Sequence, residues 1–191
     1  MKDLKDTINS LHLDNQLKTE SIPNVDLYMD QVIQLFESTY EQSIRQNEKI
    51  LTKTMINNYA KEKLFFPIQK KKYSKEHLML INFIYQLKGG LSIQDIKIAL
   101  TMFNQQFLED KSFSIEAIYE LYLNIQTENA IKFEKEVTDK FEDITLKLNE
   151  VEVSNVNQLE SFYRLASAIH MSNMYRKVAE KIIDDLSKES L

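Results

Sequence analysis

The sequence predicts an all-α protein that ends in a long helical hairpin. Only 2 Gly and 2 Pro occur among its 191 residues, and so few turn-forming residues favour long helices over the many turns of a sandwich or barrel. Apolar residues recur at helical spacing along most of the chain. Hydrophobic residues make up 43% of the sequence, which is enough for a packed core.

The charges are distributed unevenly along the chain. Residues 45–75 contain nine basic and two acidic residues, a net charge of +7, whereas the remainder contains 15 basic and 27 acidic residues, a net charge of −12. An acidic protein with one basic segment is typical of a localised contact with a polyanion. A solvated basic face without a ligand explains the same charges and stays open as an alternative.

Several classes of function are not expected. The chain has no cysteine, which excludes disulfides and thiolate metal sites. No apolar run reaches the roughly 18 residues of a membrane span and no leader opens the chain, so we expect a cytoplasmic protein without a membrane contact. His12, His77 and His170 show no metal-ligand spacing. Asp26 and Asp30 are one helical turn apart, and a solvated helix face explains them better than a cation site.

Catalytic motifs are likewise missing from the sequence. It contains no Gly-rich phosphate loop, nucleophile elbow or pair of catalytic carboxylates. We therefore expect no enzyme and no cofactor.

The N-terminal half divides into short helices with recognisable starts. Residues 1–21 form a polar arm, and a helix is expected over about 26–45. Thr52 and Ser74 can cap helices over about 53–64 and 75–88 through their hydroxyls. Ser92 and Asp95 have the spacing of a capping box before a short helix that reaches about residue 103. The helix over 75–88 is apolar around most of its circumference and is expected to be central and buried.

The predicted helix over 53–64 has one polar face and one apolar face. Met55, Ile56 and Tyr59 lie on the apolar side. Asn can pair with adenine and Lys can reach guanine acceptors in the major groove, and lysines in a neighbouring loop can bind phosphates. The sequence therefore predicts contacts with double-stranded DNA through Lys53, Thr54, Asn57, Asn58, Lys61, Lys70, Lys71, Lys72 and Tyr73.

The order of these motifs resembles the N-terminal domain of the MerR family. The resemblance covers about residues 27–100 and rests on the segment 52–59, then Leu64, Pro67, the Lys72-Tyr73-Ser74 segment, His77-Leu78, Ile84 and Leu91–Ile96. It implies a winged helix-turn-helix whose wing is the segment around Lys70–Lys72, and a sequence-specific transcriptional regulator. The chain departs from the MerR pattern at two points: Asn57-Asn58-Tyr59 replaces Arg-Tyr-Tyr, and Lys63 replaces the turn glycine.

A second resemblance is closer. Residues 22–31 and 51–59 resemble a family of uncharacterised proteins of low-GC Gram-positive bacteria, catalogued as a domain of unknown function, over about residues 20–125. This resemblance implies a bacterial regulator and brings no known ligand.

The C-terminal half predicts two long helices. A stripe from Ile118 to Leu148 fits about 35 helical residues that begin at Ser114, and a last helix starts near Val156. The predicted division is an arm (1–21), a MerR-like winged helix-turn-helix (22–104) and a helical dimerisation or effector region (105–191). Phe133, Phe141 and Ile144 are the expected contacts of a homodimer.

Three alternatives remain open at this point. The two long helices can form a hairpin within a monomer, or line a pocket for an unknown small-molecule effector. The whole chain can also be a protein-interaction module with a vestigial helix-turn-helix.

Overall fold

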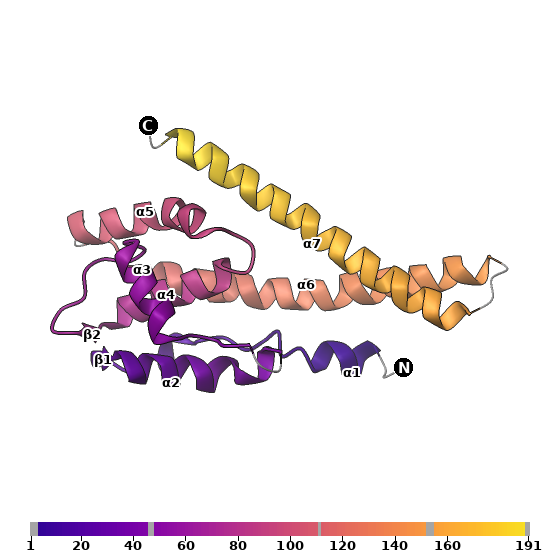
Figure 1. Ribbon diagram of the computed structural model, residues 1–191, viewed down its shortest axis with the longest axis horizontal. Helices are drawn as coiled ribbons and strands as arrows, with labels where there is room; N and C mark the ends of the chain where they lie inside the picture. Colours follow the sequence, from indigo (N-terminus) through magenta and orange to yellow (C-terminus); the bar gives the residue numbers. More distant parts are fainter. Residues whose placement is uncertain (1–3, 46–47, 111, 152–154, 190–191) are drawn as a thin grey trace.

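The computed structural model describes residues 4–45, 48–110, 112–151 and 155–189 (Figure 1). These residues form seven α-helices and one small sheet, which confirms the predicted all-α class. The helices are α1 (Leu4–Asn9), α2 (Met29–Tyr40), α3 (Lys53–Lys61), α4 (Lys75–Leu87), α5 (Ile93–Glu109), α6 (Ile115–Asn149) and α7 (Val156–Glu189). The strands β1 (Leu27–Tyr28) and β2 (Lys72–Tyr73) pair in antiparallel register. Within the described ranges, no helix is both long and apolar enough to cross a membrane.

Helix α4 is the centre of the core, as its apolar circumference predicts. Every residue from His77 to Ile84 is buried. Side chains from α2, α3, α5 and the first turns of α6 surround it, among them Phe36, Ile56, Leu100 and Tyr119. Because one helix is covered on all sides, the N-terminal segments share a single hydrophobic core.

A buried hydrogen-bond network crosses this core. The Tyr40 hydroxyl donates to Asn82 Oδ1 (2.7 Å), and Asn82 Nδ2 donates to the Tyr119 hydroxyl (2.8 Å). Tyr119 in turn donates to the carbonyl of Leu17 (2.6 Å), whose backbone N–H donates to Tyr40 (3.2 Å). The network joins α2, α4 and α6 to the segment before α2, so Leu17 is fully buried within the region predicted as an arm.

The predicted caps define where most helices start. Thr52, Ser92 and Ser114 each accept a hydrogen bond from the backbone N–H three residues later, which satisfies a donor that the first turn leaves free. Helices α3, α4, α6 and α7 begin within one residue of the predicted starts. Helix α5 runs on to Glu109, beyond the predicted end near residue 103.

Helix α2 is shorter than the predicted 26–45. The backbone of Leu27 and Tyr28 is extended because it pairs with Tyr73 and Lys72. The helix therefore starts at Met29, with the Gln31 side chain accepting from the Tyr28 N–H. At the other end it stops at Tyr40 and gives way to a single 3₁₀ turn, Glu41–Ser43. Residues 41–52 then connect α2 to α3, a longer link than the three or four residues that usually join a helix-turn-helix.

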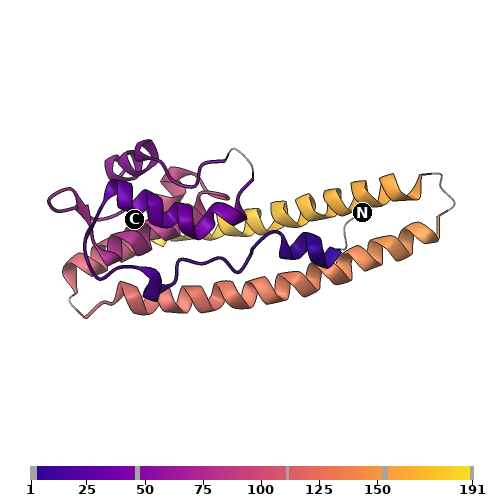
Figure 2. The same cartoon turned by 90° about the horizontal axis from the view of Figure 1, so that it is seen from below.

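Helices α6 and α7 contact each other near the end of α6 and the start of α7 but are not packed together along their length. Figure 1 shows α7 diverging from α6 after their contact, and the C-terminal part of α7 contacts α5. Figure 2 shows the two helices from below, separated along most of their length. Near the meeting point, Arg164 is ion-paired with Glu160 (2.7 Å) and lies over the ring of Phe141 (5.3 Å to the centroid). The contact between the two helices of the predicted antiparallel hairpin is thus limited to the region around these residues.

Candidate nucleic-acid interface

A tight turn carries the run of lysines. Residues 69–72 form a β-turn in which the Lys72 N–H donates to the carbonyl of Gln69 (2.9 Å). Lys70 and Lys71 occupy its two central positions with φ of 49° and 60°. Positive φ at both positions identifies a type I′ turn, which normally carries Asn-Gly or Gly because side chains with a Cβ are strained there. We call residues 69–72 the basic hairpin.

The base of the basic hairpin is fixed by aromatic packing. The ring centroids of Phe65, Phe66 and Tyr73 lie 4.0–6.1 Å from that of His77, and those of Phe65 and Tyr73 lie 6.2 Å apart. Phe66 also stacks on Phe107 of α5 (4.4 Å). Tyr73 is only 1% exposed, because β2 turns its side chain into this cluster. It therefore lies in the core, apart from the exposed lysines with which the sequence grouped it.

His77 holds the cluster through both ring nitrogens. Its Nδ1 accepts from the Ser74 N–H (3.1 Å), and its Nε2 lies 3.1 Å from the carbonyl of Phe66. The first contact needs an unprotonated Nδ1, so the ring is neutral with its proton on Nε2. Burial lowers the pKa of His77 from 6.5, and the nearby Phe66 carbonyl, Glu76 and Asp26 only partly offset this.

Helix α3 presents the polar side chains predicted for it. Ile56 and Tyr59 are buried and Met55 is half-buried. The opposite side is exposed and is called here the polar face of α3; it consists of Lys53, Thr54, Asn57, Asn58 and Lys61. The helix ends in a Schellman motif, with the Leu64 N–H donating to the Tyr59 carbonyl (3.0 Å) and Lys63 at φ 58°. Lys63 thus occupies a position that usually requires glycine.

Two contacts connect the start of α3 with the basic hairpin. Lys53 Nζ is 2.7 Å from a carboxylate oxygen of Asp30, in the first turn of α2. Two residues before Asp30, Tyr28 pairs with Lys72 across the sheet, and Lys72 Nζ lies over the Tyr28 ring (5.1 Å to the centroid). The polar face of α3 and the basic hairpin therefore flank the N-terminus of α2.

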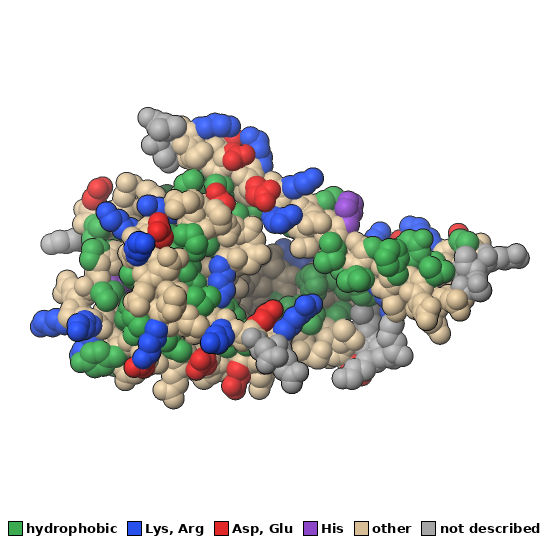
Figure 3. Space-filling model, in the orientation of Figure 1, with side chains coloured by type: hydrophobic (Ala, Val, Ile, Leu, Met, Phe, Trp, Pro, Cys, Tyr) green, Lys and Arg blue, Asp and Glu red, His purple; other side chains and the backbone are tan. Residues whose placement is uncertain are grey.

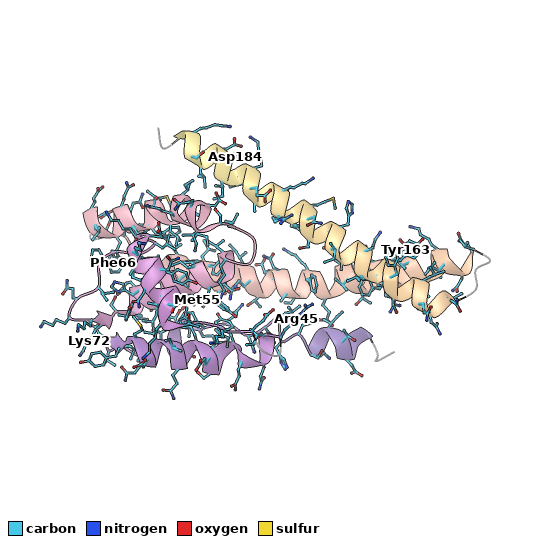
Figure 4. The ribbon with its side chains drawn as sticks, viewed as in Figure 1. Arg45, Met55, Phe66, Lys72, Tyr163 and Asp184 are labelled. Atoms are coloured by element: carbon cyan, nitrogen blue, oxygen red, sulfur yellow. The ribbon has the colours of Figure 1, made fainter. Side chains whose placement is uncertain are left out.

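The lysines of the basic hairpin differ in how available they are to a ligand. Within the described residues, Lys70 and Lys71 take part in no ion pair and are exposed. Lys72 is half-buried against Tyr28 and points outward at the end of the molecule (Figure 4). Figure 3 shows Lys and Arg side chains at this same end, among others spread over the visible face. Such a surface can bind closely spaced phosphates, while the amide and hydroxyl groups of α3 can accept and donate hydrogen bonds.

The remaining predicted sites lie elsewhere. Phe133 is exposed on α6, whereas Phe141 and Ile144 are half-buried near α7. Asp26 and Asp30 are both exposed; no group of three or more possible metal ligands occurs in the described ranges. An open groove of about 350 Å³ lies between Leu13 and the middle of α6, where Tyr122 and Phe133 line it.

Sequence reasoning missed the backbone strain and the pairing of Lys53. The left-handed conformation at Lys70 and Lys71 depends on a hairpin whose second strand pairs with residues 27–28, far away in the chain. Lys-Lys itself carries no turn signal. The one available hint was Lys63, which the MerR resemblance placed at a glycine position.

The comparisons with known proteins give one family and no close relative. Searches of curated proteins and of solved structures returned no match. One family model, described as a domain of unknown function (DUF1836), matches residues 17–122. This match covers more than half of the chain, including Leu17, α3, the basic hairpin and Tyr119. The protein therefore belongs to the DUF1836 family.

Proposed function

We propose that this protein is a sequence-specific DNA-binding regulator of transcription. In this proposal the polar face of α3 enters the major groove and the basic hairpin lies along the phosphates. The observation that carries the proposal is the pair of unpaired lysines at the strained tip of the hairpin, next to an exposed helix rich in Asn, Thr and Lys.

The backbone strain at Lys70 and Lys71 points to a role for their side chains. A left-handed residue with a Cβ costs about 1–2 kcal/mol, and a type I′ turn accepts Asn-Gly without that cost. Strained residues tend to occur where their side chains have a role. Lys70 and Lys71 add nothing to the core, because both are exposed. Their positive charges at the tip are the property that glycine or asparagine would lack.

The electrostatics support a localised contact in preference to general coating of nucleic acid. Outside residues 45–75 the chain carries a net charge of −12, which disfavours phosphate contacts there. The basic hairpin and the polar face of α3 lie within residues 45–75, and they flank one helix end. A phosphate contact at the hairpin fixes the register, and base contacts from α3 supply the sequence preference.

The arrangement we propose is a winged helix-turn-helix of the MerR kind over residues 22–104, with the basic hairpin as the wing. Its long link between α2 and α3 sets it apart from a standard helix-turn-helix.

A cytoplasmic location follows from a role on DNA, and a small-molecule effector would fit the groove beside Tyr122 and Phe133. A protein-interaction module with no DNA contact is the alternative, and it predicts no binding to duplex DNA.

Asn57 provides the test of sequence reading. It lies on the exposed side of α3 and is expected to contact a base edge. Asn57→Ala should relax the preference at one base pair by about 1–3 kcal/mol, measured by binding-site selection from a random duplex library. Asn129→Ala, an exposed asparagine on α6, is the matched control and should return the wild-type motif.

The proposal of base reading is rejected if the Asn57→Ala protein selects the same motif as the wild type. Circular dichroism of both variants checks that the helices remain, since neither side chain is buried.

A further inference from the structure

A carboxylate lies within the surface that we propose to bind DNA. Asp30 is in the first turn of α2, the helix end that the polar face of α3 and the basic hairpin flank, and its side chain is 74% exposed. A carboxylate repels phosphates, so a surface that contacts only the DNA backbone gains nothing from it. Asp30 is nonetheless held at this surface by Lys53, whose Nζ is 2.7 Å from its Oδ1.

The ion pair of Lys53 and Asp30 joins two helices and stays open to a ligand. Lys53 is the first residue of α3, and its side chain is 65% exposed. An ion pair this exposed adds little to the stability of the fold. A lysine side chain has many rotamers, however, and the contact with Asp30 restricts where the ammonium group lies. The cation and the carboxylate therefore meet a ligand side by side at the start of α3.

A G·C base pair matches these two charges in the major groove. Guanine presents the acceptors N7 and O6, to which a lysine donates, and cytosine presents the N4 amino group, which donates to a carboxylate. One base pair thus offers acceptors and a donor next to each other. An A·T pair presents thymine O4 where cytosine has N4, and that acceptor repels a carboxylate.

We infer that Lys53 and Asp30 read one G·C base pair together, with Lys53 donating to guanine and Asp30 accepting from the cytosine amino group. This inference rests on the proposed function, because it takes α3 to lie in the major groove, where the N-terminal residues of a recognition helix contact base edges. Asp30 belongs to α2, so the base-reading surface extends beyond α3.

The distance between this base pair and the one read by Asn57 follows from the helix. Lys53 and Asn57 are four residues apart on α3, which is about 6 Å along the helix axis. Successive base pairs lie about 3.4 Å apart. We therefore expect the G·C pair one or two positions from the base pair that Asn57 contacts.

Binding-site selection from a random duplex library tests the inference. The wild type should select a G·C pair at one position. Asp30→Ala and Lys53→Ala should each lower the preference at that position by about tenfold and leave the position read by Asn57 unchanged. Asp30→Asn should select G·C and A·T alike, because an amide can accept from cytosine N4 or donate to thymine O4.

An exposed ion pair far from α3 provides the matched control. Asp185 pairs with Lys181 on α7 (2.8 Å), and Asp185→Asn should return the wild-type motif. The affinity for a random duplex then separates a lost base contact from damage to the fold. Asp30→Ala removes a negative charge, so this affinity should not fall while the base preference does, whereas unfolding lowers both.

The possible failures of the inference and of the proposed function differ. If the wild type selects a motif and Asp30→Ala returns the same motif at every position, the inference is overturned and the proposed function stands. A preference lost in Lys53→Ala but kept in Asp30→Ala also overturns it, since Lys53 then reads the base alone. A wild type that does not bind duplex DNA overturns the proposed function and the inference with it.

Discussion

Exchanging the two lysines at the tip of the basic hairpin for the residues that its backbone prefers should separate stability from function. Lys70→Asn with Lys71→Gly restores the Asn-Gly pair of a type I′ turn. Both side chains at the tip are exposed, so the substitution removes two charges and the backbone strain and leaves the packing of Phe65, Phe66 and Tyr73 in place.

The magnitudes follow from the two φ angles, 49° and 60°. Each left-handed lysine lowers the free energy of unfolding by about 1–2 kcal/mol. The new glycine lowers it by about 0.5–1 kcal/mol, because glycine has more freedom in the unfolded chain. The free energy of unfolding should therefore rise by about 1–3.5 kcal/mol, with a Tm increase of roughly 2–4 °C per kcal/mol for a chain of this size. The loss of two phosphate contacts should flatten the salt dependence of DNA binding by about 1.8 in log–log slope.

The assay pairs thermal unfolding with fluorescence anisotropy on a labelled random duplex. The expected result is a more stable protein that binds DNA more weakly, an outcome that partial unfolding does not produce. Lys70→Arg with Lys71→Arg keeps both charges and should bind DNA as the wild type does. Lys63→Gly, which relieves the left-handed residue at the end of α3, should raise stability without removing the hairpin charges. Unchanged DNA affinity in the Asn-Gly variant refutes the role of the basic hairpin, and a lower Tm refutes the strain argument.

Three further outcomes follow from single contacts. Asp30→Asn frees Lys53 from its exposed ion pair, so affinity for duplex DNA in an anisotropy titration should rise, most clearly at low salt; a lower affinity would contradict this. Asn82→Leu removes the acceptor of the buried Tyr40 hydroxyl and the donor to the buried Tyr119 hydroxyl and should cost about 2–4 kcal/mol in urea unfolding, whereas a loss near zero would show that the network is dispensable. Because the folded-state pKa of His77 is depressed below 6.5, the unfolded chain takes up the proton first as the pH falls. The free energy of unfolding in urea should be highest above pH 6.5 and should fall as the pH drops below that value. In His77→Gln, whose side chain can still accept from the Ser74 N–H, this pH dependence should be weaker than in the wild type.

Local signals made much of the fold predictable. A hydroxyl that accepts from a backbone N–H three residues later depends only on nearby sequence, and Thr52, Ser92 and Ser114 all behave in this way. The buried character of α4 follows equally from its own composition. Likewise, the spacing of Ile56 and Tyr59 determines which side of α3 is exposed, so the polar face of α3 was predictable residue by residue.

Features that depend on distant partners were not predictable from these signals. Helix α2 starts late because residues 27–28 pair with residues 72–73, and no local pattern marks that pairing. Tyr73 was grouped with the exposed lysines, but the aromatic cluster around His77 draws it inward. The course of α7 away from α6 likewise depends on tertiary contacts with α5, and a stripe of apolar residues does not specify which helix covers it.

The salt dependence of binding to a random duplex is the decisive measurement for phosphate binding by the basic hairpin. Each phosphate neutralised by a lysine contributes about 0.9 to the log–log slope. With contacts from Lys70, Lys71 and Lys72, the affinity measured by anisotropy should fall with increasing salt with a slope of about −2.7 or steeper. The absence of binding even at the lowest salt concentration, or an affinity that does not change with salt, would contradict the claim that this surface binds DNA.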